Sequence, residues 1–457
     1  MIFSEEKINQ LIVSRDEPSN EIVDGILNKA ANKNGLEIDE VATLLHINNE
    51  SNRQKLFAVA KKIKDDIYGN RLVLFAPLYI SDYCVNNCKY CGFHCDNNAS
   101  RKKLSLIEVS QQVKILEDMG HKRLLLEFGE DPENNPIDYV VDVIKTIYNT
   151  KSGRGEIRRV NVNIASTTVD NYKKLHSCGI GTYQLFQETY HFPTYKKLHQ
   201  GPKADYDRQI TAHERAFEAG IDDFGLGVLF GLYDYKYEVL ALISHAQYLD
   251  KKLGVGPHTI SVPRFNPAPT VDLSPEFKMS DKDFLKIIAI IRLAVPYTGM
   301  IISTRESPEI RRQAFQIGIS QASAASRTSP GGYKKKDDYS QEISQFDLYD
   351  HRSLEEVNLD ICSLGYLPSY CTACYRSQRT GERFMELAKT GKIHELCQPN
   401  ALQTFYEYLL DYAMPETRRL GIEMIKNEIK KIDNLKVRGK LIDNLKKIKN
   451  GERDLFI

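Results

Sequence analysis

The chain has 457 residues, and 42% of them are hydrophobic, which is enough for a substantial core. Its 62 lysines and arginines nearly balance its 61 aspartates and glutamates, which excludes a global surface for nucleic acid or an anionic membrane. No run of about 18 apolar residues occurs, and the polar, acidic beginning MIFSEEKINQ differs from a signal peptide, so we expect a cytoplasmic protein.

Residues 1–70 predict a helical N-terminal extension. Apolar residues recur at helical spacing in EVATLLHI (40–47) and KLFAVAKKI (55–63), with polar joints between the segments. The alternative, a loosely packed tail, is disfavoured by this spacing.

From residue 71 to residue 330, eight short β-rich runs alternate with amphipathic helical segments. The runs are 71–81, 123–130, 158–166, 182–190, 222–231, 259–266, 299–306 and 319–326. The helical segments include 105–120, 168–179, 208–220 and 281–295. Alternating βα units indicate a parallel sheet, and eight of them over roughly 250 residues match a (β/α)8 barrel. We therefore predict an α/β fold with a TIM-type barrel, and a doubly wound open sheet is the alternative.

Residues 331–457 are predicted to form a C-terminal helical domain. The barrel pattern ends after residue 327, where the polar, Gly-containing connector TSPGGYKKKDDYSQ (328–341) follows. The last part of the chain, 424–456, is a Lys-rich amphipathic helix pair. A solvated surface explains these lysines more simply than a docking patch for an acidic partner.

The nine cysteines indicate metal binding. An odd number in a chain of this kind argues against a disulfide framework, and six of the nine fall into two tight groups. The first group is Cys84, Cys88 and Cys91, and the second is Cys371, Cys374 and Cys397. Cys178 and Cys362 are interpreted as ordinary thiols.

The first group follows the first predicted strand with the spacing CxxxCxxC. Three thiolates can hold three irons of a 4Fe–4S cluster and leave the fourth iron open. In the radical chemistry of S-adenosylmethionine (SAM), the open iron binds the methionine end of SAM, and an electron then releases a 5′-deoxyadenosyl radical. The loop therefore predicts a radical SAM cluster, with Tyr90 as an aromatic wall for the adenine. A zinc knuckle with His94 or Cys95 as the fourth ligand is the alternative.

Further SAM contacts are predicted near the carboxyl ends of the second and fourth strands. Gly129 and Glu130 end the second strand, where backbone carbonyls and a carboxylate are candidates for holding the SAM ammonium. Glu188 ends the fourth strand and is another candidate. Arg208 and Arg215, in the next helical segment, are candidates for the SAM carboxylate, although a surface charge is the commoner role for such residues.

The second cysteine group has the spacing CX2CX22C. The CxxC pair alone is equally compatible with zinc binding or redox chemistry. His258 immediately precedes the sixth predicted strand, so it is expected at the amino-terminal mouth of the barrel, opposite the Cys84–Cys91 loop. A C-terminal domain that covers this mouth would bring the second group close to His258.

From about residue 71 onward, the chain resembles the tyrosine lyases of the radical SAM superfamily, and among them the family that matures iron–iron hydrogenase. The stretches that carry this resemblance are LFAPLYISDYCVNNCKYCGF (74–93), RVNVNIASTTVDNYKKL (159–175), GTYQLFQETYHFPTY (181–195), GVLFGLYD (227–234), GVGPHTISVPR (254–264) and SRTSPGGY (326–333). The thiamine-pathway tyrosine lyase shares the barrel motifs but lacks a C-terminal cluster.

The resemblance implies a second, auxiliary 4Fe–4S cluster on the C-terminal cysteines. It further implies a labile fifth iron, bound to that cluster through an extra sulfur, carrying a free cysteine and ligated by His258. The implied reaction cleaves the Cα–Cβ bond of L-tyrosine to para-cresol and dehydroglycine. Dehydroglycine then yields carbon monoxide and cyanide at the auxiliary iron, for assembly of the hydrogenase H-cluster. The implied partners are a low-potential ferredoxin or flavodoxin and the other hydrogenase maturases.

An amino-acid substrate in a dry barrel needs a partner for its α-carboxylate, for which a bidentate guanidinium is suited. Arg305 ends the seventh strand at the same face as the first cysteine group, and Ser323 is a candidate partner for the substrate amine. An ion pair of Arg305 with Glu306 or another neighbour is the alternative.

Three positions depart from the family pattern. Phe128 replaces a small residue before Gly129, Ala325 stands where a glycine is expected, and the HQGPK segment is one residue short. The remaining functional alternatives are a thiamine-type tyrosine lyase (2-iminoacetate synthase), a sulfur-inserting radical SAM enzyme of the biotin-synthase kind, and a non-catalytic iron–sulfur carrier.

Overall fold

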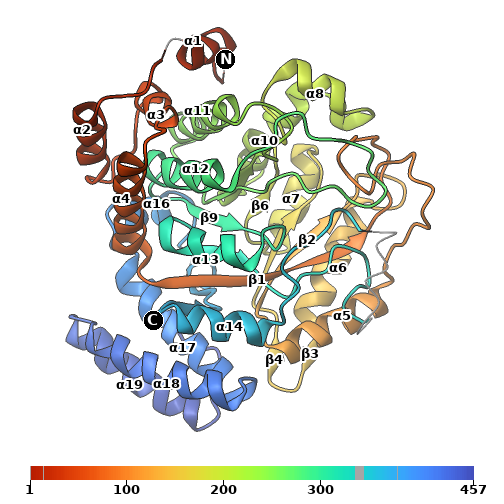
Figure 1. The fold of residues 1–457 in the computed structure, drawn as a ribbon. Helices are drawn as coiled ribbons and strands as arrows, with labels where there is room; N and C mark the ends of the chain where they lie inside the picture. Colours follow the sequence, from red (N-terminus) through yellow and green to blue (C-terminus); the bar gives the residue numbers. More distant parts are fainter. Residues whose placement is uncertain (1, 14, 335–343, 378) are drawn as a thin grey trace.

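The structure is a computed structural model that describes residues 2–13, 15–334, 344–377 and 379–457 (Figure 1). Residues 335–341 of the predicted connector lie outside the described residues.

Eight parallel strands form a closed barrel at the centre of the molecule (Figure 1). They are β1 (Arg71–Ser81), β2 (Arg123–Phe128), β5 (Arg159–Asn163), β6 (Tyr183–Gln184), β7 (Phe224–Gly227), β8 (Thr259–Ser261), β9 (Gly299–Ile302) and β10 (Gln321–Ser323). The parallel pairing of β1 with β10, in which Val73 is opposite Gln321, closes the sheet. The predicted (β/α)8 barrel is therefore confirmed, and the open-sheet alternative is wrong.

Helices surround this barrel. They are α5 (Leu106–Met119), α6 (Ile137–Asn149), α7 (Val169–Ser177), α10 (Ala212–Glu218), α11 (Tyr235–Leu253), α12 (Asp281–Ala294) and α13 (Pro308–Ile317). Three shorter elements lie between β6 and α10, namely α8 (Phe192–Leu198), η1 (Pro202–Ala204) and α9 (Tyr206–Ile210).

Local sequence signals fix the helix ends. Helix α5 begins after Ser105, which forms a capping box with Glu108, and it ends at Gly120 in the left-handed conformation (φ 102°). The segment 208–220, predicted as one helix, is instead divided between α9 and α10 at Thr211.

The N-terminal extension is folded against the barrel. Its helices are α1 (Glu5–Val13), α2 (Asn20–Ala30), α3 (Ile38–Leu45) and α4 (Glu50–Tyr68). They contribute fully buried side chains such as Val23 and Leu56 to the same core as the barrel helices α11 and α12. Lys286 of α12 donates hydrogen bonds to the carbonyls of Leu45 and Ile47 (3.2 Å each). The loosely packed tail is therefore excluded.

The C-terminal segment covers the amino-terminal mouth of the barrel. It contains β11 (Leu367–Ser369), α14 (Leu354–Ser363), α15 (Ala373–Arg376), α16 (Gly381–Lys389), α17 (His394–Asp411), α18 (Pro415–Lys430) and α19 (Leu435–Lys449). Strand β11 pairs in parallel with the first residues of β1, with Arg71 opposite Leu367. Neither β11 nor the small hairpin β3 (Lys151–Ser152) and β4 (Gly155–Glu156) is predicted from the sequence.

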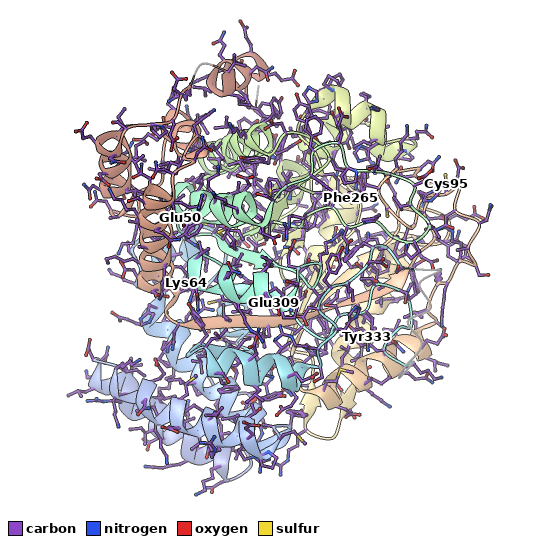
Figure 2. The ribbon with its side chains drawn as sticks, in the orientation of Figure 1. Glu50, Lys64, Cys95, Phe265, Glu309 and Tyr333 are labelled. Carbon is purple, nitrogen blue, oxygen red and sulfur yellow. The ribbon has the colours of Figure 1, made fainter. Side chains whose placement is uncertain are left out.

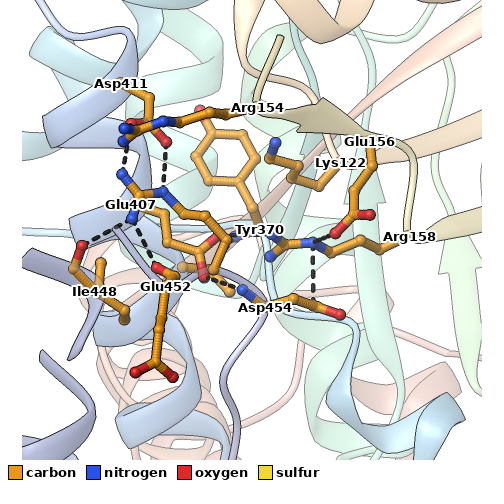
Figure 3. A network of polar contacts seen from close by, with 12 residues as sticks. Lys122, Arg154, Glu156, Arg158, Tyr370, Glu407, Asp411, Ile448, Glu452 and Asp454 are labelled. Atoms are coloured by element: carbon orange, nitrogen blue, oxygen red, sulfur yellow. Dashed lines mark hydrogen bonds and ion pairs between the residues drawn. The ribbon is translucent and has the colours of Figure 1, made fainter. Parts of the chain in front are cut away.

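A polar network joins the β3–β4 region to the C-terminal helices (Figure 3). One guanidinium nitrogen of Arg158 lies 2.8 Å from Glu407 of α17, and Nε lies 3.0 Å from Asp454. Nearby, Arg453 donates to Asp411 (2.7 Å). The contacts of Arg158 connect the C-terminal segment to the barrel wall.

One continuous hydrophobic cluster includes residues from the extension, the barrel and the C-terminal helices. The division into 1–70, 71–330 and 331–457 stays a prediction. Within the described residues, no helix combines the length and apolar character that a membrane crossing requires.

Candidate active site and metal centres

Three thiols of the loop after β1 face a cavity of about 100 Å³ at the carboxyl-terminal mouth of the barrel. They belong to Cys84, Cys88 and Cys91. Burial raises the pKa of all three thiols, that of Cys91 to about 11. The backbone N–H of Phe93 donates to Cys91 Sγ (3.4 Å). Three thiols around one cavity fit a 4Fe–4S cluster with an open iron, since iron would favour the thiolate form.

The loop is held by a close approach to the end of β2. A Cβ atom added to Gly129 would lie 2.2 Å from the carbonyl oxygen of Tyr83, so only glycine fits at this position. The Val85 N–H donates to the carbonyl of Glu130 (2.8 Å), and the Gly129 N–H donates to that of Ser81 (2.9 Å). The motif of Gly129 and Glu130 thus positions the cysteine loop as well as lining its cavity.

The carboxylate of Glu130 connects the loop to Arg208. Asn86 donates to Oε2 of Glu130 (2.7 Å), and Arg208 donates to Oε1 (2.6 Å). Glu130 and Phe128 line both the cavity of the cysteine thiols and a second cavity of about 250 Å³, and Arg208 lines only the second. The aromatic ring of Phe128 meets Tyr139 edge-on, with the ring centroids 6.4 Å apart.

Arg215 lies elsewhere. Its guanidinium donates to the carbonyl of Thr167 (3.1 Å), to Ser166 Oγ (2.6 Å) and to Thr211 Oγ1 (2.7 Å). Arg215 also donates to the carbonyl of Arg208 (2.5 Å), so it braces the backbone that carries Arg208, whereas the Arg208 side chain lines a cavity.

Glu188 also lines the cysteine cavity, and it forms an ion pair that the sequence did not reveal. Its Oε1 lies 2.8 Å from Nζ of Lys203, and its backbone has a positive φ of 69°. Burial alone would lower the pKa of Lys203, but Glu188 raises it above its usual value. Lys203 lies in the HQGPK segment, where spacing gives no signal for a site.

Tyr90 contributes a buried ring to the same cavity. Its hydroxyl lies 2.8 Å from Nε2 of His199, which fixes the orientation of the ring. His94 and Cys95, the possible fourth zinc ligands, are absent from the residues that line this cavity. Cys95 is exposed at the outer edge of the molecule (Figure 2). Within the described chain, no three His, Cys, Asp or Glu side chains converge closely enough to hold a single metal ion.

A further cavity of about 110 Å³ extends from the cysteine loop into the barrel, and Arg305 and Ser323 both line it. The guanidinium of Arg305 lies 3.2 Å from the ring centroid of Phe346. Glu306 instead accepts hydrogen bonds from Arg264 (3.0 and 3.1 Å). Among the described residues Arg305 has no ion-pair partner, so the predicted alternative of a pair with Glu306 is wrong.

The second cysteine group faces the opposite mouth of the barrel. Cys371 follows β11, Cys374 lies on α15 and Cys397 lies in the first turn of α17, and together with His258 they line a cavity of about 50 Å³. The Ala373 N–H donates to Cys371 Sγ (3.4 Å). The hydrogen bond between Cys374 and Cys397 lowers the pKa of the Cys397 thiol. Three thiols beside one histidine fit a second cluster with an open position.

His258 is oriented by its neighbours. Its ring stacks on Phe384 with centroids 3.9 Å apart, and Nδ1 lies 2.8 Å from Oδ2 of Asp223. A carboxylate on one imidazole nitrogen leaves the other nitrogen available as a metal ligand. Asp223 is the residue before β7, and no motif in the sequence pointed to it.

Comparisons with known proteins agree with this geometry. A family profile described as the radical SAM superfamily matches residues 78–245, and one described as the biotin and thiamin synthesis associated domain matches residues 261–367. The chain is 54% identical to HydG in a crystal structure described as a maturase of the [FeFe]-hydrogenase, with a TM-score of 0.96 and 100% of each chain covered. The chain belongs to the HydG family of the radical SAM superfamily.

Two other relatives support this assignment. HydG from Carboxydothermus hydrogenoformans is 42% identical, with a TM-score of 0.83 and 96% of each chain covered. The 2-iminoacetate synthase of Salmonella typhimurium is 30% identical over 342 residues, which are 74% of this chain and 88% of that protein. The predicted family is therefore confirmed, and this HydG-family chain is a radical SAM lyase whose cofactors are an iron–sulfur cluster and SAM. A non-catalytic carrier is excluded.

Proposed function

We propose that this chain cleaves the Cα–Cβ bond of L-tyrosine and converts the dehydroglycine fragment to carbon monoxide and cyanide for the H-cluster of an iron–iron hydrogenase. The observation that carries the proposal is the pair of thiol triads at opposite mouths of one barrel. A tyrosine lyase alone requires only the first triad. Para-cresol is the other product of the cleavage.

The carboxyl-terminal mouth is the proposed site of tyrosine cleavage. Cys84, Cys88 and Cys91 would hold a 4Fe–4S cluster, which together with SAM supplies a 5′-deoxyadenosyl radical. The polar residues around the thiols would hold SAM. They are the side chains of Tyr90, Glu130 and Glu188 and the backbone of Gly129, with Arg208 behind Glu130 on the neighbouring cavity. Arg215 would act only through the backbone that positions Arg208, because its own donors are engaged.

Arg305 is the proposed partner of the tyrosine carboxylate. It lines the barrel cavity without an ion-pair partner among the described residues, and a guanidinium binds a carboxylate through two parallel hydrogen bonds. Ser323 lines the same cavity, and its Oγ accepts a hydrogen bond from the Thr304 N–H (3.2 Å), which leaves the hydroxyl proton for a substrate atom.

The amino-terminal mouth is the proposed site of the diatomic ligands. Cys371, Cys374 and Cys397 would hold the auxiliary cluster, and His258 would ligate a labile fifth iron that carries a free cysteine. The ring of His258 is held by Asp223 and Phe384, so one nitrogen is presented without further rearrangement. On this proposal, residues 71–330 form the lyase domain, and residues 331–457 form the auxiliary domain.

Reduction requires a low-potential donor, for which we propose a ferredoxin or flavodoxin, and the iron-bound product would pass to the other hydrogenase maturases. The alternative is a 2-iminoacetate synthase activity, which the 30% identity to the Salmonella typhimurium enzyme favours. That activity would produce cresol without iron-bound carbon monoxide.

One experiment separates these two functions. The protein is reconstituted without oxygen with iron, sulfide and cysteine, and it then receives dithionite, SAM and carbon-13-labelled tyrosine. Infrared bands of iron-bound CO and CN that shift with the isotope are expected. Cresol without such bands would establish the simpler lyase and contradict the roles of His258 and the C-terminal cysteines.

A further inference from the structure

Glu127 occupies a position between the two cavities of the carboxyl-terminal mouth. It lies near the end of β2, with Tyr79 of β1 and Asn163 of β5 as its partners across the sheet. Its side chain lines both the cavity of the cysteine thiols and the deeper cavity that holds Arg305. An atom that contacts Glu127 can therefore lie beside the SAM site and the substrate site together.

The acids at this mouth differ in their partners. Glu188 is paired with Lys203 (2.8 Å), and Glu130 is paired with Arg208 (2.6 Å). Within the described residues Glu127 has no lysine, arginine or histidine within ion-pair distance. Burial raises the pKa of Glu127 to about 8, and the positive charge of Arg305 opposes this rise.

Arg305 and Glu127 thus form a complementary set. One cavity contains a guanidinium without an anionic ion-pair partner and a carboxyl group without a cationic one. A buried guanidinium and a buried carboxyl group are costly to leave without partners, and one ligand can supply both partners. A zwitterionic α-amino acid carries both of the missing charges on neighbouring groups.

We propose that Glu127 binds the α-ammonium group of the amino-acid substrate while Arg305 binds its α-carboxylate. The inference rests on the proposed function and names the residue that recognises the amino end of the substrate. It gives Ser323 a secondary role, because the Ser323 hydroxyl already accepts a backbone hydrogen bond. It also places the substrate amine next to the cavity of Cys84, Cys88 and Cys91.

Three ligands test the assignment by binding alone. They are L-tyrosine, tyramine, which lacks the carboxylate, and 3-(4-hydroxyphenyl)propanoate, which lacks the amine. Dissociation constants are measured by anaerobic equilibrium dialysis of the reconstituted enzyme with SAM and without reductant, so that no ligand is consumed. The variants are Glu127→Gln, which keeps the shape of the side chain, and Arg305→Gln.

The expected result is a crossed pattern. Glu127→Gln weakens tyrosine and tyramine by about 30-fold or more, since one partner of an enclosed charge pair is lost, and leaves the propanoate within about twofold. Arg305→Gln weakens tyrosine and the propanoate and leaves tyramine unchanged. Unchanged binding of the propanoate also shows that the Glu127→Gln cavity is folded.

The matched control is Glu117→Gln. Glu117 is a buried acid on α5 whose pKa burial raises to about 7, and it lines neither cavity. The Glu117→Gln substitution should leave the dissociation constants of all three ligands unchanged. Equal effects of Glu127→Gln on all three ligands, or no effect on any, would overturn the inference while tyrosine cleavage by the wild type still supported the proposed function. Failure of the wild type to bind tyrosine would overturn both.

Discussion

The two mouths of the barrel present similar thiol triads that are built in different ways. At the carboxyl-terminal mouth, eight consecutive residues supply all three sulfurs on one loop. At the amino-terminal mouth, the sulfurs come from the residues after β11, from α15 and from α17, and the histidine comes from the barrel. The first site needs only a folded barrel, whereas the second needs a C-terminal segment docked on that barrel.

Because the two triads are built from different parts of the chain, we expect that each site can be lost without the other. We call the site at the carboxyl-terminal mouth the upper site and the one at the amino-terminal mouth the lower site. Contacts with the end of β2 hold the cysteine loop of the upper site, for example the close approach of Gly129 to Tyr83. The lower site depends on the pairing of β11 with β1 and on the ion pairs of Arg158 with the C-terminal helices. Substitutions can therefore remove one centre and keep the other.

The largest expected effect follows from Cys88→Ala. Two thiolates cannot replace the three that a 4Fe–4S cluster with one open iron uses, so 5′-deoxyadenosine formation should fall to background and about four irons per chain should be lost. Chromatography of the nucleoside and iron analysis measure the result. Cys95→Ala, at an exposed neighbouring cysteine, is the control and should retain activity. Normal SAM cleavage by Cys88→Ala would contradict the proposal that Cys84, Cys88 and Cys91 hold the radical SAM cluster.

Cys374→Ala should remove the cluster at the amino-terminal mouth and leave the one at the carboxyl-terminal mouth. The upper site stays intact, so cresol should still form, while iron-bound carbon monoxide should disappear because the lower triad is incomplete. Cresol is measured by chromatography and carbon monoxide by infrared spectroscopy. The matched control is Cys178→Ala, at a partly exposed thiol outside both triads. Loss of cresol together with carbon monoxide would show that the two centres are not independent.

Arg158→Ala tests how the lower segment is held. Arg158 and Glu407 are 3% and 2% exposed, and leaving one charge of such a pair unpaired costs about 3 kcal/mol. The midpoint of thermal unfolding should fall, and the lower cluster should be lost before the upper one. Lys173→Ala removes an exposed pair with Asp170 and should change stability by less than about 0.5 kcal/mol. Equal stability of the two variants would show that the polar network of Figure 3 does not hold the C-terminal segment on the barrel.

The contrast between the mouths also explains what could be predicted from the sequence. The eight strands and the CxxxCxxC loop depend on short-range patterns, which the sequence contains in full. The pairing of Glu188 with Lys203 and of His258 with Asp223 depends on chain segments that meet only after folding. Strand β11 has the sequence Leu-Pro-Ser, which has no strand character until it pairs with β1.

The positions of Arg208 and Arg215 also could not be predicted from the sequence, although both residues lie in one short segment. The sequence favours a continuous helix over 208–220, on which two residues seven positions apart share a face. The break at Thr211 directs Arg208 to the cavity and Arg215 to the backbone of Thr167. Periodicity predicts the helix but gives no sign of this break.

The smallest expected effect concerns backbone strain at the carboxyl-terminal mouth. Glu188 and Ala325 both have positive φ there, and Ala325, at 52°, stands where the resemblance led us to expect glycine. A Cβ atom in the left-handed region costs about 1–2 kcal/mol, and the greater freedom of glycine in the unfolded chain removes about half of the gain. Ala325→Gly should therefore raise the free energy of unfolding by about 0.5–1 kcal/mol.

Ala324→Gly is the control for this strain, because Ala324 is fully buried and its φ is not positive. It should lower the free energy of unfolding by about 1 kcal/mol, as glycine gains nothing at an ordinary φ. Opposite signs for these adjacent substitutions, measured by denaturant unfolding, would locate the strain in one backbone angle. A loss of stability in both variants would mean that the packing of the Ala325 methyl group contributes more to stability than its positive φ costs. Alanine at this position would then be explained by better packing rather than by a tolerated strain.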